Sequence, residues 1–109
     1  MGFLAVFSAA RISRRIDTLA AAVADQCRDR VYLRLSAHVA TMGHAEARGY
    51  VRARAAAVVR REVGAVLWAE PALPEWAHRR LLAAATERVV HRVADDLLFG
   101  RRPRSAKAA

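Results

Sequence analysis

The residues best suited to chemistry in this chain are four histidines and one cysteine. Their spacing matches no recognisable catalytic or metal-binding motif. Glu87, His91 and Asp95 follow one another at intervals of four, which places them on one helix face and imitates the edge of a metal site. Zinc sites need three or four converging ligands and take most of them from His or Cys. We therefore predict no metal here, only a solvated helix face stabilised by side-chain pairs four residues apart.

No pairing of a nucleophile with a base is evident in the sequence. The serines lie outside any strand–turn–helix elbow, and the glycines are isolated rather than grouped into a phosphate-binding loop. Cys27 has no partner for an internal disulfide, and we expect it to be a small buried apolar side chain. The sequence thus predicts a non-enzymatic protein with no cofactor and no small-molecule substrate, although catalysis completed by a second subunit stays open.

Arginine dominates the charge of the chain. It supplies 18 of the 19 basic residues, and against ten acids the net charge is +9. A charge of this size favours an anionic partner. A second interpretation stays open, because GC-rich genomes favour arginine and alanine, and arginine stems also cover apolar surface.

Almost half of the excess positive charge lies in the last nine residues. Residues 101–109 carry four positive charges and no acid, which predicts a disordered basic tail. In a predicted helix upstream, Arg54 and Arg61 share one face and Arg60 lies about 100° away. We predict that these groups contact nucleic-acid phosphates without strong sequence preference. The predicted nucleic-acid-binding residues are Arg54, Arg60, Arg61, Arg101, Arg102, Arg104 and Lys107.

Trp68 and Trp76 flank a segment that contains two prolines. The favoured prediction is that both rings pack around Leu73 and close the open end of a helical hairpin. The alternative is that their faces stack on nucleic-acid bases beside Arg79 and Arg80.

The segment Gly2–Ala10 is apolar and is followed by Arg11, Arg14 and Arg15. This charge order is the reverse of that in a secretory signal, and nine residues are too few to cross a bilayer, so we expect a cytoplasmic protein. Docking of this segment on the chain's own hairpin or on a second copy is the favoured interpretation. Binding to an anionic membrane surface is the less favoured one.

Helical periodicity dominates the sequence and begins with an apolar stripe: Ile12, Ile16, Leu19, Val23, Cys27, Val31 and Leu35. Its later members are spaced by four, which rotates the stripe by about 40° at each step. We therefore expect a kink or break around Asp25–Arg30. Residues 31–39 also alternate like a strand, but a single strand would have to pair across a dimer, so we favour helix there.

Two further helices are predicted. Gly43 and Glu46 mark the start of one that runs from about His44 to Trp68, and its Gly49 and Gly64 suggest close approach of a neighbouring helix. Its expected buried side is Val51, Ala55, Val58, Val59, Val63 and Val66. Pro71 ends this helix, and Pro74 begins a third that reaches about Phe99 before Gly100. The short connection predicts an antiparallel hairpin.

The predicted protein is all-α, a small bundle over residues 1–100 in which an N-terminal helical segment packs on an antiparallel two-helix hairpin. Because alanine supplies much of the apolar surface, we expect a homodimer. The leading hypothesis is a small basic protein that binds nucleic acid. The alternative is a helical interaction subunit or oligomeric structural protein that uses the stripe of residues 3–35, namely Phe3, Phe7, Ile12, Ile16, Leu19 and Val23.

Overall fold

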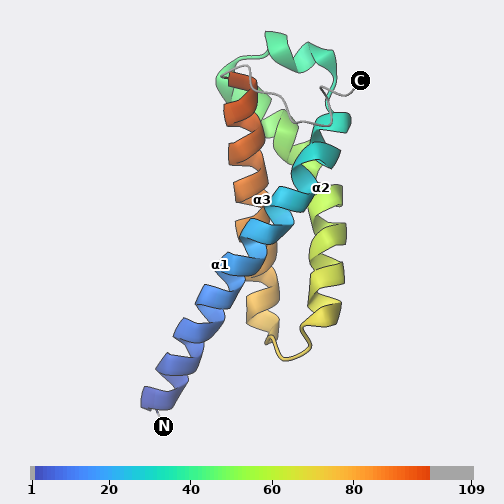
Figure 1. Ribbon diagram of the computed structural model, residues 1–109. Helices are drawn as coiled ribbons and strands as arrows, with labels where there is room; N and C mark the ends of the chain where they lie inside the picture. Colours follow the sequence, from blue (N-terminus) through green and yellow to red (C-terminus); the bar gives the residue numbers. More distant parts are fainter. Residues whose placement is uncertain (1, 99–109) are drawn as a thin grey trace.

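The computed structural model describes residues 2–98, with side chains from residue 8 to residue 97, so the basic tail lies outside the described residues. The chain forms three α-helices and one short 3-10 helix: α1 (Gly2–Leu33), η1 (Ala37–Thr41), α2 (His44–Ala69) and α3 (Glu75–Leu98). Helices α2 and α3 make an antiparallel hairpin, and α1 crosses it obliquely (Figure 1). The predicted all-α bundle is confirmed, and residues 2–98 contain no strand.

The core is built from small side chains. Valine and alanine fill most of it, Leu81 and Ile16 are its larger members, and within the described residues no aromatic ring is fully buried. The buried set from α2 is Val51, Ala55, Val58, Val59 and Val63, as the spacing predicted, while Val66 is only partly buried. Small side chains let helix axes approach closely, so the three helices share one continuous core.

Helix α1 is continuous through Asp25–Arg30, so the predicted break there is wrong. The stripe nevertheless drifts as expected, and both Cys27 and Val31 are fully buried. Rows of side chains spaced by four are inclined to the helix axis, so a helix that crosses its neighbours at an angle keeps such a row in contact. The oblique crossing in Figure 1 therefore replaces the break.

The helix expected over residues 31–39 extends only to Leu33. Beyond it the backbone turns into η1, which is capped by the Ser36 side chain accepting a hydrogen bond from the His38 N–H. The Ser36 N–H donates to the Tyr50 hydroxyl at 2.9 Å. These local and cross-helix bonds use backbone groups that would otherwise extend the helix, which is why the helix prediction fails past Leu33.

The tryptophans do not close the hairpin, so that prediction is wrong. Trp68 is 90% exposed and Trp76 is 40% exposed, whereas Leu73 in the loop packs partly against the core. Trp68 lies five residues after the buried Val63, which places it about 140° around α2 from the core. The loop is instead held by a contact of 3.2 Å between the His78 ring and the Leu73 carbonyl.

Gly49 and Gly64 do not mark close helix contacts, contrary to the prediction. Both are exposed within α2, and a Cβ atom added at either would meet nothing within 4 Å. The two glycines therefore cost helix stability without any packing gain.

Gly64→Ala is expected to raise the free energy of unfolding by about 0.5–1 kcal/mol, because alanine restricts the unfolded chain and meets no neighbour in the folded one. Urea unfolding followed by circular dichroism measures this. The matched control is Ala65→Gly at the next exposed position, which should lower stability by a similar amount. A neutral or destabilising Gly64→Ala would contradict the open environment described for Gly64.

Candidate nucleic-acid interface

The outer side of α2 carries a narrow solvent-facing stripe. Its members recur at helical spacing and stay within a sector of about 60°: Tyr50, Arg54, Ala57, Arg61 and Trp68. All are exposed except Tyr50, which is half-buried because its hydroxyl holds the segment after α1. The stripe therefore combines two arginines with two aromatic side chains.

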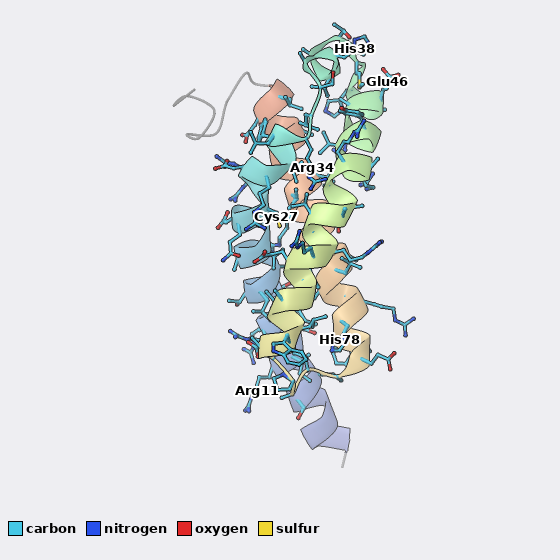
Figure 2. All side chains as sticks on the ribbon, turned by 90° about the vertical axis from the view of Figure 1, so that its right-hand side faces the viewer. Arg11, Cys27, Arg34, His38, Glu46 and His78 are labelled. Atoms are coloured by element: carbon cyan, nitrogen blue, oxygen red, sulfur yellow. The ribbon has the colours of Figure 1, made fainter. Side chains whose placement is uncertain are left out.

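The carboxyl end of α1 lies beside this stripe and adds further arginines. A shallow depression of about 340 Å³ lies between them, lined by Arg30 and Leu33 of α1, by Arg34 directly after it, and by Ala57, Val58 and Arg61 of α2. Leu33 is 80% exposed at this place. Figure 2 looks from the α2 side of the molecule, with Arg34 labelled above Cys27. We call Arg30, Arg34, Arg54 and Arg61 the α1–α2 arginine face.

Most of the charge on the α1–α2 arginine face is uncompensated. Arg30 bonds to Glu62 at 3.3 Å, and the Arg54 guanidinium lies 5.3 Å from the centre of the Tyr50 ring. Among the described residues, Arg34, Arg54 and Arg61 have no acidic partner. Three guanidinium groups from two helices are therefore free to bind an anion.

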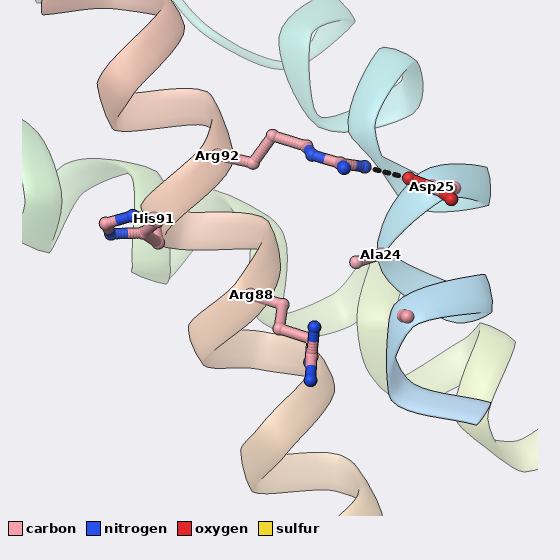
Figure 3. Close-up of a pocket in the computed structure, with 6 residues that line it drawn as sticks. Ala24, Asp25, Arg88, His91 and Arg92 are labelled. Atoms are coloured by element: carbon pink, nitrogen blue, oxygen red, sulfur yellow. Dashed lines mark hydrogen bonds and ion pairs between the residues drawn. The ribbon is translucent and has the colours of Figure 1, made fainter. Parts of the chain in front are cut away.

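Arginines elsewhere are more often paired. Between α1 and α3, a smaller depression of about 210 Å³ is spanned by the ion pair of Arg92 with Asp25, while Arg88 and His91 also line it (Figure 3). Between α2 and α3, Arg52 bonds to Glu87 at 2.7 Å. These pairs neutralise part of the positive charge along the α1–α3 and α2–α3 sides of the bundle.

The predicted binding residues divide into three groups. Arg54 and Arg61 lie together on the arginine face, while Arg60 is exposed about 100° around α2. Arg101, Arg102, Arg104 and Lys107 lie outside the described residues. Sequence reasoning missed Arg30 and Arg34, because no spacing rule relates residues on separate helices whose crossing is unknown.

The apolar stripe predicted for a partner is largely used within the chain. Ile16 and Val23 are buried in the core, and Ile12 and Leu19 pack partly against it. The side chains of Phe3 and Phe7 lie outside the described residues.

The histidine and carboxylate ladder on α3 is a solvated face, as predicted. His91 pairs with Asp95 at 3.2 Å, four residues on, and Glu87 pairs with Arg52. Nowhere in the described part of the chain do three or more histidine, cysteine or acidic side chains gather where they could hold a metal ion.

Two titratable groups of α1 face the core, Cys27 toward α2 and Tyr32 toward α3. Burial raises the pKa of the Cys27 thiol above its ordinary 9.0, the Glu62 carboxylate adds to this, and the thiol lies 4.0 Å from the Val58 carbonyl. Burial also raises the pKa of Tyr32 above 10.0, and the nearby carboxylate of Asp96 adds to it. Cys27 is thus the buried apolar side chain that its sequence context predicted.

No protein-family model, curated protein or solved structure matches this chain. None of the helices within residues 2–98 combines the length and apolar character needed to cross a membrane. The candidate interface therefore rests on its geometry and charge.

The raised pKa values predict alkaline destabilisation. Because the folded protein keeps the protons on Cys27 and Tyr32, the free energy of unfolding should fall as pH rises above 9.0 and then above 10.0, where the unfolded chain releases them. Urea unfolding between about pH 8 and about pH 11 measures this. The variant Cys27→Ala/Tyr32→Phe should show a shallower decline, and an unchanged decline would contradict the assignment.

Proposed function

We propose that this protein binds nucleic acid through phosphate contacts made by the α1–α2 arginine face, without strong sequence preference and without catalysis. The observation that carries the proposal is the grouping of Arg34, Arg54 and Arg61, which are exposed and lack acidic partners in the described residues. The planar guanidinium group matches the geometry of a phosphate, and its charge displaces condensed counterions.

The spacing of these arginines suits a backbone rather than a single phosphate. Arg54 and Arg61 are seven residues apart, or about 10.5 Å along α2. Two guanidinium groups this far apart would contact different phosphates of one backbone rather than share a single phosphate. Arg34, just after α1, would widen the contact, and Arg60 with the tail residues would extend it.

We place this function in the cytoplasm, where nucleic acid is accessible. A homodimer would double the number of phosphate contacts. A binding role without strong sequence preference is also consistent with an interface made of charged side chains on helix surfaces, because phosphate contacts carry no sequence information.

Replacing Arg54 and Arg61 together by alanine is expected to weaken binding of a short duplex, measured by fluorescence anisotropy. For the unaltered protein, affinity should fall steeply between about 50 mM and about 200 mM salt. The double variant should lower the slope of log affinity against log salt by about two, since each phosphate contact contributes about 0.9.

The matched control is Arg79→Ala/Arg88→Ala, which removes the same charge from exposed arginines of α3 that have no acidic partner among the described residues. It should change the slope much less. Equal effects of the two double variants would assign binding to net charge alone, and a flat salt dependence of the unaltered protein would refute the function.

Removal of residues 101–109 tests the tail separately. If its four positive charges meet phosphates, the salt slope should fall by about three or four while the helical signal in circular dichroism is retained. An unchanged slope would contradict the predicted contacts of Arg101, Arg102, Arg104 and Lys107.

A further inference from the structure

The end of the bundle that carries the α2–α3 loop has properties that the nucleic-acid proposal does not use. Helix α1 extends past this loop (Figure 1). Toward its N-terminus, the described side chains make polar contacts between α1 and the hairpin at Arg15 with Glu70 and at Arg80 with the Ser13 hydroxyl, the latter at 3.5 Å. The segment 2–10 therefore projects beyond the hairpin as about 13.5 Å of helix.

The projecting segment, which we call the α1 tip, is apolar in sequence. Residues 2–10 read GFLAVFSAA and contain no charged residue, and Ser8, Ala9 and Ala10 at its base are exposed. A contiguous apolar segment that extends beyond the core of a fold is a candidate binding surface.

Two exposed tryptophans lie at the same end of the molecule. Trp68 precedes the loop and is 90% exposed, while Trp76 follows the loop and is 40% exposed. The Arg80 guanidinium lies 5.3 Å from the centre of the Trp76 ring. Tryptophan with one apolar and one polar side is favoured at the boundary between lipid and water.

The charge at this end is positive. Arg11, Arg14, Arg79 and Arg80 are exposed and have no acidic partner in the described part of the chain, while Arg15 is paired. The acids of this end are Asp17, Glu70 and Glu75, so five arginines stand against three carboxylates. Attraction to an anionic surface and repulsion from an identical end both follow.

We propose that this end docks on an anionic phospholipid surface, with the α1 tip in the headgroup region and Trp68 and Trp76 at the boundary with water. Because α1 continues without a break into the core, the bundle would stand end-on at the surface. A tip-to-tip contact between two copies would bring like charges together, which favours lipid over a second copy as the occupant.

Co-sedimentation with vesicles tests this proposal independently of the nucleic-acid function. The protein should bind vesicles of phosphatidylcholine with phosphatidylglycerol, bind pure phosphatidylcholine weakly, and shift its tryptophan emission to shorter wavelength on binding. Phe3→Ala/Phe7→Ala should weaken partitioning by about tenfold or more. The matched control, Leu33→Ala, removes an exposed apolar side chain at the other end of α1 and should bind as the unaltered protein does.

Paired arginine variants separate the two anionic partners. Arg11→Ala/Arg14→Ala should weaken vesicle binding and leave duplex binding unchanged, and Arg54→Ala/Arg61→Ala should do the reverse. The proposal is overturned if the folded protein does not bind anionic vesicles, or if Leu33→Ala weakens vesicle binding as much as the phenylalanine variant does. It is also overturned if sedimentation velocity shows that the phenylalanine variant has lost a dimer while its vesicle binding is unchanged. In that case a second copy of the chain would be the occupant of the α1 tip.

Discussion

The contact between α1 and the hairpin determines the rest of this structure. Small side chains from all three helices, among them Cys27, Val31 and Val59, are fully buried where the helices meet. Their size permits close approach, and the inclined row on α1 sets an oblique crossing. That crossing brings Arg30 and Arg34 beside α2 and also carries residues 2–10 past the α2–α3 loop. Both proposed surfaces are therefore consequences of one packing arrangement.

Ion pairs between the helices determine where positive charge stays available. Arg92 with Asp25 ties α3 to α1, Arg30 with Glu62 ties α1 to α2, and Arg52 with Glu87 ties α2 to α3. These pairs are largely exposed, and such pairs contribute about 0–1 kcal/mol each. The pairs have a larger effect on the distribution of charge, because a carboxylate that pairs with one arginine is not available to neutralise another. Within the described residues, arginines without an acidic partner therefore remain both on the α1–α2 arginine face and at the end that carries the α2–α3 loop.

Local features of the sequence predicted local features of the fold. Gly43, Pro71 and Pro74 act through their own backbone, so the bounds of α2 and the start of α3 were predictable, and periodicity identified the buried face of α2. Three failures share one physical cause. The continuity of α1, the exposure of Trp68 and the open space at Gly64 all depend on the direction from which a neighbouring helix approaches, which spacing along one helix does not contain. For the same reason Arg54 and Arg61 could be grouped from sequence, whereas Arg34 could not be added to them.

The central claim is that arginines from two helices form one phosphate-binding face because α1 crosses α2 where it does. Backbone amide chemical shifts, recorded by NMR during titration with a short oligonucleotide, test this most directly. Residues 30–34 at the end of α1 and just beyond it should shift together with residues 54–61 of α2 at the same ligand concentrations, while the amides of α3 change little. Shifts centred on α3, or shifts in α2 without any in α1, would contradict the claim.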